Sequence, residues 1–195
     1  MSVVVAPLTG DALAQALPAL AQLRMEVFRA FPYLYDGSPE YERQYLRAFT
    51  QSRDAVLVAA RDGDTIVGCA TGSGIGPNHE ELIEPLANAG IDLDTTFYCG
   101  ESVLLPAYRG QGVGHAFFDH REAQARAHGY KRSLFCGVAR PADHPRRPAD
   151  HRPLDDFWRA RGYRPLPGVI AEFSWKDLEE AEESAKPMQF WMREL

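Results

Sequence analysis

The chain has 195 residues, of which 45% are hydrophobic and 25% are charged, and its formal net charge is −6. This length and composition suit one soluble globular domain over residues 1–195. The acidic balance argues against a nucleic-acid partner, which would need a basic stripe. No apolar stretch is long enough to span a membrane, and the N-terminus lacks the basic and apolar parts of a signal peptide. We therefore expect a cytoplasmic protein that binds neither nucleic acid nor membrane.

The first third of the chain has the pattern of one strand, two helices and a hairpin. The predicted ranges are a strand at 3–5, helices at about 11–29 and 39–51, and paired strands at 55–61 and 65–71. Pro7 should end the first strand, and Pro18 should kink the first helix or delay its start. Ser38 is the expected N-cap of the second helix, and Asp62-Gly63 is a strong hairpin signal.

The rest of the chain alternates strands with helices. The predicted ranges are a short helix within 78–89, a strand at 96–105, a helix at 112–128, a strand at 132–139, a short helix at 154–161, and strands at 168–175 and 188–193. A strand, a helix and a strand in succession imply a right-handed crossover and a parallel pair, while the hairpins imply antiparallel pairs. The predicted fold class is α/β, with a mixed, mostly antiparallel central sheet and helices on both faces. We expect the acidic connector 177–185 to be a solvated loop.

Three cysteines, Cys69, Cys99 and Cys136, each lie within an apolar run. Their odd number and wide separation favour reduced core residues over a disulfide framework or a metal site with paired spacing. His144 and His151 each follow an aspartate, but these pairs lie among prolines and arginines, where a solvated loop is the more common arrangement. We therefore expect no bound metal.

The most informative stretch is 103–118, in which an apolar run ends at Pro106 and a helical pattern starts a few residues later. Between them lie Gly110, Gly112 and Gly114, which let the backbone turn tightly and bring successive N–H groups to one place. These N–H groups, with the positive end of the following helix, form an anion site suited to a pyrophosphate.

Three phosphate-binding patterns compete for this turn. A Walker A loop would need lysine and then serine or threonine after its last glycine, whereas Gly114 is followed by His115-Ala116. The dinucleotide fingerprint would need glycine at position 115 and an acidic residue at the end of the next strand, and 136–140 has none. The pattern Arg/Gln-x-x-Gly-x-Gly/Ala is met at every position from Arg109 to Gly114. A turn that serves packing alone is the remaining alternative.

The segment Leu104-Leu105-Pro106-Ala107-Tyr108-Arg109-Gly110 resembles the GNAT acetyltransferase signature between the fourth strand and the third helix. The segment 156–163 is similar to the family's Phe-Tyr-x-x-x-Gly segment, and the element order β-α-α-β-β-β-α-β-α-β-β agrees with that of the family. The resemblance implies acetyl-CoA as the donor, with its pyrophosphate on the amides of the turn and its pantetheine arm along 99–105. The implied CoA-binding residues are Leu104, Leu105, Arg109, Gly110, Gln111, Gly112, Val113 and Gly114.

Attack of an amine on the thioester requires a base, because an amine with a pKa near 10.4 is neutral in only about one molecule in 10³ at pH 7. The strand before the turn offers two candidate catalytic residues, Glu101 and Tyr98. Glu101 is a carboxylate in an otherwise apolar strand, and Gly100 beside it is consistent with a bulge. We predict Glu101 as general base or acceptor anchor, with Tyr98 second. A structural ion pair is the alternative role for Glu101.

The family often places the acid for the leaving thiolate on the tyrosine of its Phe-Tyr-x-x-x-Gly segment. The matching residue here is Trp158, whose indole cannot serve as that acid. Two classes of function therefore stay open. One is an N-acetyltransferase that acts on an amine of a small molecule or a peptide, and the other is a module that binds or senses CoA without catalysis.

Aromatic residues around the junction of the first two predicted helices are candidates for the wall of the acceptor pocket. They are Tyr33, Tyr35 and Tyr41, with Tyr45 one turn further on. In the family this segment often lines the acceptor site. Packing of a helical hairpin is the alternative.

Two C-terminal features bear on partners. Arg140 and other arginines of the loop 140–153 could contact the nucleotide phosphate of CoA or an anionic acceptor, with simple solubility as the alternative. The last predicted strand, from Met188 to Met192, is apolar enough to pack between the subunits of a homodimer.

Overall fold

The computed structural model describes residues 3–195. Its seven strands form one sheet in the order β1-β2-β3-β4-β5-β7-β6. The strands are β1 (Val4–Leu8), β2 (Val56–Asp62), β3 (Thr65–Gly74), β4 (Thr96–Leu104), β5 (Arg132–Val138), β6 (Arg164–Trp175) and β7 (Ser184–Glu194). Neighbouring strands pair antiparallel except for β4 and β5, which are parallel. This arrangement confirms the predicted mixed, mostly antiparallel sheet.

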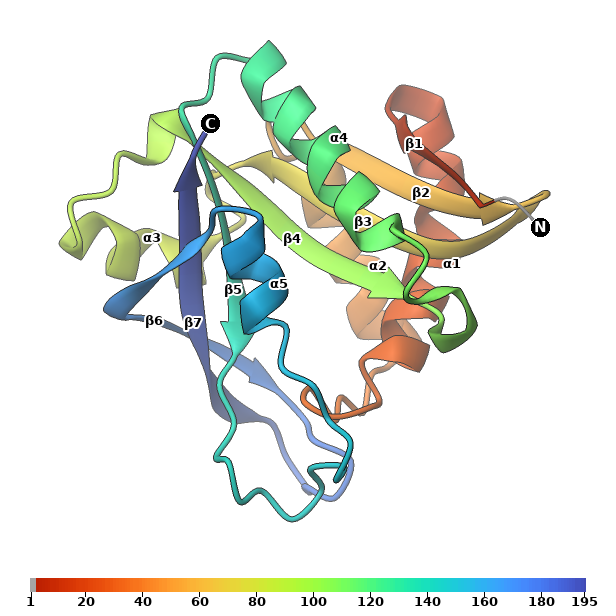
Figure 1. The fold of residues 1–195 in the computed structure, drawn as a ribbon, viewed down its shortest axis with the longest axis vertical. Coiled ribbons are helices and arrows are strands. Elements are labelled where there is room, and N and C mark those ends of the chain that lie inside the picture. Colours follow the sequence, from red (N-terminus) through yellow and green to blue (C-terminus); the bar gives the residue numbers. More distant parts are fainter. Residues whose placement is uncertain (1–2) are drawn as a thin grey trace.

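Five α-helices cover the two faces of this sheet (Figure 1). They are α1 (Gly10–Val27), α2 (Pro39–Thr50), α3 (Glu80–Asn88), α4 (Val113–Ala127) and α5 (Asp155–Ala160). In Figure 1, α4 crosses the front of β2, β3 and β4 with α5 beside it over β5, while α1 and α2 lie behind. Short 3-10 turns precede and follow β4 at Leu93–Thr95 and Pro106–Tyr108. Helices on both faces were the expected arrangement, and they are confirmed.

Several local signals act as the sequence predicts. The Ser38 hydroxyl accepts a hydrogen bond from the Tyr41 N–H at 3.2 Å, and Pro39 opens α2 at a position where no intrahelical N–H is needed. In the β2–β3 hairpin, Gly63 adopts φ +58°, a left-handed conformation that glycine reaches without strain.

The predicted end of the first strand at Pro7 is wrong, and of the two effects predicted for Pro18 only the delayed helix start is excluded. β1 continues through Pro7, which stands opposite Val58 in the register with β2. Because β1 is an edge strand, it has one side on which a missing N–H breaks no ladder bond. The helix α1 begins at Gly10 and includes Pro18, so its start is not delayed.

The C-terminal hairpin is longer than predicted, because β6 begins at Arg164 and β7 at Ser184. Prolines at the start of β6 break the simple alternation, and its register with β7 shifts between Pro165 and Ile170. The connector is also not simply solvated. The buried Lys186 ammonium lies 2.9 Å from a carboxylate oxygen of Glu180, which ties the connector to β7.

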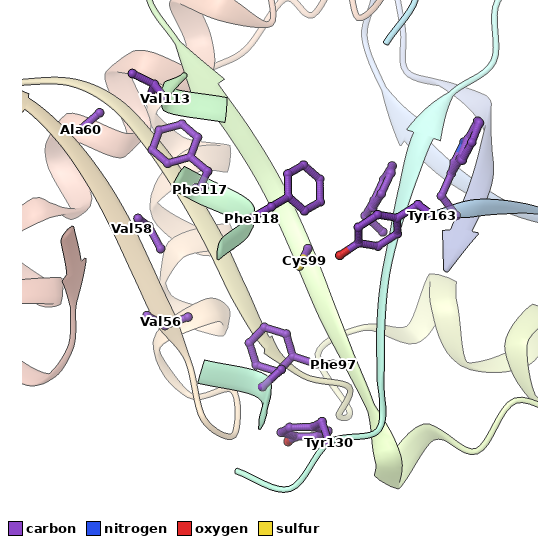
Figure 2. Packing of buried hydrophobic residues seen from close by; sticks show 14 of the residues in the cluster. Val56, Val58, Ala60, Phe97, Cys99, Val113, Phe117, Phe118, Tyr130 and Tyr163 are labelled. Atoms are coloured by element: carbon purple, nitrogen blue, oxygen red, sulfur yellow. The ribbon is translucent and has the colours of Figure 1, made fainter. Parts of the chain in front are cut away.

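The core on the α4 side of the sheet is built from aromatic and β-branched side chains (Figure 2). Phe117 and Phe118 of α4 pack there against Val58 of β2 and Phe97 of β4. Separate clusters bury the residues under α1 and α2, and those between α3, β5, β6 and β7. Burial of this apolar surface is the main stabilising contribution to the fold.

The three cysteines, Cys69, Cys99 and Cys136, are free and buried, as predicted. None of the helices in residues 3–195 is long and apolar enough to cross a membrane. The strand β7 lies between β5 and β6, and its residues Phe190 and Trp191 are buried within the chain. These side chains are therefore not available for a contact between subunits, and the homodimer stays a prediction without that support.

Candidate functional site

The parallel strands β4 and β5 diverge along their length. They pair at three successive positions, which end at Tyr98 opposite Leu134. Beyond this point β4 continues to Leu104 and β5 to Val138 without pairing to each other. The two strands separate on the way to the glycine-rich turn, so main-chain groups of both strands face the space between them (Figure 1).

A bulge interrupts β4 where the strands diverge. In the register with β3, Cys99 lies opposite Gly72 and Ser102 lies opposite Ala70. Three steps along β4 therefore match two steps along β3, which is the pattern of a β-bulge. The bulge contains Gly100 and Glu101, in agreement with the bulge expected from Gly100 in the sequence.

Close approach of the two strands requires glycine at position 100. A Cβ there would lie 2.5 Å from Oγ1 of Thr71, which is a buried side chain of β3. Both Gly100 and Glu101 line the same pocket, although neighbouring residues of a regular strand point to opposite faces.

This pocket is a cavity of about 170 Å³ between α1, α2, α3 and the diverging strands. Eight aromatic side chains line it, and they are Phe28, Tyr33, Tyr35, Tyr41, Tyr45, Tyr98, Phe173 and Trp175. The three tyrosines predicted for the acceptor wall, Tyr33, Tyr35 and Tyr41, are therefore brought together with the predicted catalytic residues Glu101 and Tyr98.

A buried charge cluster forms one wall of the pocket. Arg24 lies between two carboxylates, with Nη1 2.9 Å from Glu101 Oε2 and Nε 2.7 Å from Glu42 Oε2. Tyr45 donates to Glu101 Oε2 at 2.6 Å, and Tyr35 donates to Glu42 Oε1 at 2.9 Å. One guanidinium thus faces two carboxylates, and the cluster carries a net negative charge.

The second carboxylate oxygen of Glu101 is free. Among the described residues, nothing donates a hydrogen bond to Glu101 Oε1, although the side chain is buried. Burial lowers the pKa of Arg24, but Glu101, Tyr45 and Glu42 outweigh this effect and raise the pKa above its ordinary value. Arg24 therefore stays cationic, and the free oxygen of Glu101 offers an acceptor to a ligand N–H.

Tyr98 reaches across the point where the strands diverge. Its hydroxyl lies 3.6 Å from the Cys136 thiol on β5, and both side chains are buried. Burial, followed by Cys136, raises the pKa of Tyr98 well above its usual value, and burial raises the pKa of Cys136 to about 12. Both groups are protonated at neutral pH, so the Tyr98 hydroxyl can donate a hydrogen bond.

Sequence reasoning missed His79, which lies at the start of α3 and lines the pocket. Burial lowers its pKa, so the ring is neutral at neutral pH. Its Nδ1 lies 3.2 Å from the Gly76 amide N–H and accepts from it, and its ring packs edge-on against Tyr98. Arg24 and Trp175 were missed as well. Their partners lie far away in the sequence, so no local pattern marks them.

Two glycines of the glycine-rich turn have a left-handed backbone. Gly110 adopts φ +75° and Gly112 adopts φ +83°, and α4 starts directly after Gly112. In the part of the chain that the structure describes, the amides from Gly110 to Gly114 donate to no protein acceptor. These N–H groups and the N-terminus of α4 are suited to an anion.

Side chains around the turn brace its backbone. Arg109 donates to the Leu104 carbonyl at 3.3 Å, and Gln111 donates to the Ala107 carbonyl at 3.2 Å. The Val113 side chain is buried in the core, so only its amide is available to a ligand. Leu104 and Leu105 are half-buried against the core at the end of β4.

Arg140 is not free to contact a phosphate. It donates to the carbonyls of Pro32 and Tyr33, each at 2.9 Å, and pairs with Asp177 at 2.9 Å. Trp175 also donates to the Tyr33 carbonyl, at 3.1 Å. These bonds strap the turn before α2 onto β6 and close one side of the pocket. The two expected roles of Arg140, anion contact and solubility, are wrong because the charge is used internally.

Two further points of the sequence analysis concern Trp158 and a possible metal site. The Trp158 ring packs against Phe135 and Trp191, and a Cβ on Gly137 would lie 3.1 Å from it, so position 158 supplies no titratable group beside β5. Within residues 3–195, no group of three or more His, Cys, Asp or Glu side chains is arranged to hold a metal ion.

Comparison with known proteins places this geometry in context. The model of the acetyltransferase (GNAT) family matches residues 17–148. No curated protein matches the sequence. The ribosomal-protein-alanine N-acetyltransferase from Brucella melitensis is a similar solved structure, with a TM-score of 0.63, 14% identity, and coverage of 98% of this chain and 99% of that chain.

Two other solved structures share the fold. The ribosomal-protein-S18-alanine N-acetyltransferase from Escherichia coli has a TM-score of 0.60 at 12% identity, with coverage of 99% of this chain and 94% of that chain. The PaiA N-acetyltransferase from Thermoplasma acidophilum, solved in complex with coenzyme A, has a TM-score of 0.54 at 12% identity, with coverage of 97% and 98%. At these identities the likeness shows the fold alone.

Proposed function

We propose that this chain, which belongs to the GNAT acetyltransferase family, transfers the acetyl group of acetyl-CoA to a primary amine of a small molecule held in the aromatic pocket. The observation that carries the proposal is Glu101, a buried carboxyl group that lines that pocket beside the point where β4 and β5 diverge and has one oxygen without a hydrogen-bond partner among residues 3–195. An amine bound there would meet a carboxylate and a donor thioester at once.

The glycine-rich turn fits the donor substrate. Among residues 3–195, five successive amides, from Gly110 to Gly114, have no protein acceptor, and they adjoin the positive end of α4, which suits the pyrophosphate of CoA. The unpaired edges of β4 and β5 beyond Tyr98 suit the amide groups of the pantetheine arm. When bound, acetyl-CoA supplies the acetyl thioester and leaves as the thiol.

Glu101 is proposed to hold the acceptor and to take its proton. An ammonium group would donate to Glu101 Oε1, while Oε2 stays fixed by Arg24 and Tyr45. Glu101 first takes one proton from the ammonium group, directly or through water, which frees the nitrogen lone pair. The neutral amine then attacks the thioester carbonyl, the C–N bond forms and the C–S bond breaks. The nitrogen loses its second proton, which ends on the CoA thiolate, so CoA leaves as the thiol. Tyr98, protonated and buried, is proposed to donate a hydrogen bond to the leaving thiolate.

The pocket favours a compact cationic acceptor with an aromatic or apolar body. The cavity is about 170 Å³, and eight of the eighteen residues that line it are Phe, Tyr or Trp. Its buried charge cluster is net negative, and ammonium groups are attracted to carboxylates and to the faces of aromatic rings. The strap made by Arg140 closes the side next to Tyr33, which favours a small molecule over a peptide.

Trp158 favours a second candidate function, a module that binds acetyl-CoA without catalysis. Its indole stands where the resemblance places an acid, and it packs into the core. In this alternative the glycine-rich turn would bind the donor, and the aromatic pocket would serve a regulatory ligand or none.

Thiol release from acetyl-CoA, followed over a panel of amines, separates the two functions. The panel should contain arylalkylamines, alkyl diamines and short peptides, with mass spectrometry of each product. The reaction without acceptor controls for the protein's own thiols. We expect stoichiometric thiol and N-acetyl product with arylalkylamines, and less with peptides. Binding of acetyl-CoA without product for any amine would favour the non-catalytic module.

A further inference from the structure

At the bulge, the alternation of β4 side chains between the two faces of the sheet is reversed. Before it, Phe97 and Cys99 pack into the cluster under α4, while Tyr98 faces the pocket. After it, Val103 packs in the cluster under α1 and α2, and Leu104 packs against the α4 side. In a regular strand, residue 101 would share the face of residues 97 and 99. The bulge alone therefore directs the Glu101 side chain into the pocket.

Arg121 of α4 lies on the opposite side of this bulge. Its side chain is only 1% exposed. Nη1 donates to the carbonyls of Thr71 and Glu101, at 3.2 and 3.3 Å, and Nε donates to the Phe117 carbonyl at 3.2 Å. A Cβ on Gly72 would lie 3.4 Å from Arg121 Cδ, so the side chain passes close against β3. The guanidinium thus joins β3 to β4 at the bulge.

Burying the guanidinium of Arg121 costs free energy, which indicates that its hydrogen bonds to the Thr71 and Glu101 carbonyls have a structural role. Arg121 pairs with no carboxylate among the described residues, and its Nη2 has no hydrogen-bond partner there. Its other close contact is the ring of Phe118, 4.6 Å away. An apolar residue would fill the same core volume without a desolvation penalty. What an apolar residue cannot do is donate to carbonyls that the bulge removes from the ladder.

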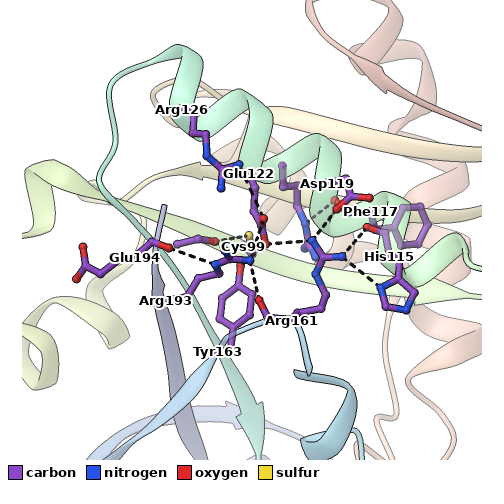
Figure 3. A network of polar contacts seen from close by, with 12 residues as sticks. Cys99, His115, Phe117, Asp119, Glu122, Arg126, Arg161, Tyr163, Arg193 and Glu194 are labelled. Carbon is purple, nitrogen blue, oxygen red and sulfur yellow. Dashed lines mark hydrogen bonds and ion pairs between the residues drawn. The ribbon is translucent and has the colours of Figure 1, made fainter. Parts of the chain in front are cut away.

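A second polar network fixes α4 so that Arg121 can reach the bulge (Figure 3). Glu122, the next residue on α4, accepts from Tyr163 at 3.1 Å and from Arg161 and Arg193, each at 3.3 Å. Tyr163 in turn lies 2.7 Å from the Ser133 hydroxyl of β5. This network reaches β4 at Cys99, whose Sγ lies 3.4 Å from Ser133 Oγ, so its outer member Arg193 provides the control.

We propose that Arg121 is a positioning residue that holds the β4 bulge and thereby keeps the carboxylate of Glu101 in the acceptor pocket. It touches neither the acceptor pocket nor the glycine-rich turn, and it acts through the Glu101 main chain. The inference rests on the proposed acetyl transfer for its kinetic consequence, but the geometric consequence is independent of any acceptor. Without the guanidinium, the two carbonyls lose their donor and the strand can return to regular register, which turns Glu101 toward α4.

The kinetic test is a double-mutant cycle between Arg121→Met and Glu101→Gln, with Arg121→Lys as the conservative variant. We expect Arg121→Met to lower kcat/KM for the acceptor about 10- to 100-fold, as for a displaced catalytic group, with the Kd of acetyl-CoA unchanged. In the Glu101→Gln background the same change should have little further effect. Arg121→Lys, which keeps a donor, should restore part of the activity, and it also serves if the methionine variant does not fold.

Arg193→Met is the matched control, because Arg193 belongs to the network on Glu122 and does not contact β3 or the bulge. It should lower the free energy of unfolding. Its effect on kcat/KM should be the same in the wild-type background and in the Glu101→Gln background. An equal loss from Arg121→Met in the presence and absence of Glu101 would overturn the proposal, since it would show a purely structural role.

A crystal structure of the Arg121 variant supplies the readout that needs no acceptor. We expect Glu101 to leave the pocket, or the register of β3 with β4 to change between residues 70 and 72. An intact bulge with Glu101 in place would contradict the proposal. If the wild-type protein turns over no amine, the proposed function fails while this structure still decides the role of Arg121.

Discussion

Arg24 and Glu101 form a buried ion pair in one wall of the pocket, with Arg24 Nη1 2.9 Å from Glu101 Oε2. The pair joins α1 to the bulge of β4, and Glu42 of α2 binds the same guanidinium. It therefore confirms the ion-pair alternative for Glu101 without removing the functional one. One oxygen of Glu101 holds the structure together, and the other is buried and has no hydrogen-bond partner among residues 3–195.

Replacing Arg24 by methionine should destabilise the protein strongly. Two buried carboxylates, Glu42 and Glu101, would lose their cation, and breaking such a pair typically costs about 3–5 kcal/mol. Urea unfolding measures the change.

Arg43→Gln is the matched control for this prediction, because Arg43 pairs with Glu40 on the exposed surface of α2. A surface pair of this kind should contribute no more than about 1 kcal/mol. Similar losses from Arg24→Met and Arg43→Gln would show that the buried cluster is not the central support of the pocket.

Gly112→Ala should weaken acetyl-CoA binding, whereas Gly114→Ala should not. Gly112 has φ +83°, and alanine in a left-handed conformation costs roughly 1–2 kcal/mol. That strain would move the amides at the start of α4 and lower the affinity about tenfold. Gly114 lacks this conformation, and its Cβ would meet only Phe157, at an ordinary 3.5 Å. Calorimetry with acetyl-CoA measures both variants, and equal Kd values would contradict the assigned site.

Gly100→Ala should distort the bulge. The new methyl group would lie 2.5 Å from Thr71 Oγ1, and overpacking of this kind costs about 1–3 kcal/mol. Turnover should fall with stability because Glu101 is the next residue. Adding Thr71→Ala removes the clashing oxygen and should restore part of both properties. Absence of any rescue in the double variant would show that the contact with Thr71 is not what requires glycine.

The connector between β6 and β7 should confer sensitivity to acid. Glu180 accepts from the Asp177 amide, Lys186 and Ser184, and these bonds lower its pKa from 4.5 to about 2. Because the folded-state pKa is depressed, the stabilisation is complete above the unfolded pKa and is lost as the pH falls from about 4.5 toward 2. Thermal unfolding of Glu180→Gln should depend less on pH in this window than that of the wild type. Identical pH profiles would count against this role of Glu180.

Local patterns predicted most of the fold. Apolar periodicity, the Ser38 cap and the hairpin glycine at 63 act within a few residues of themselves, so a sequence shows them directly. The glycine-rich turn is local in the same sense. The long C-terminal strands were underestimated because prolines and charged residues obscure their alternation, and pairing with a neighbouring strand decides where they end.

The candidate site was only partly predictable. Glu101 and the tyrosines were found as unusual residues in their own segments. The partner of Glu101 was not found from the sequence. Arg24 is an ordinary polar residue within a helical pattern, and it contacts Glu101 only in the folded chain. The same holds for Arg121, because a strand sequence does not reveal which helix residue supports its bulge.

The central claim is that Glu101 serves an acetyl transfer from acetyl-CoA to an amine in the aromatic pocket. Its most direct test measures N-acetyl product and released CoA for Glu101→Gln beside Glu42→Gln. The two carboxylates share Arg24, but only Glu101 lines the pocket. We predict that Glu101→Gln lowers kcat about 10²-fold or more, the typical contribution of a general base, while Glu42→Gln retains most of its turnover. Full turnover of Glu101→Gln from about pH 6 to pH 9 would contradict the claim.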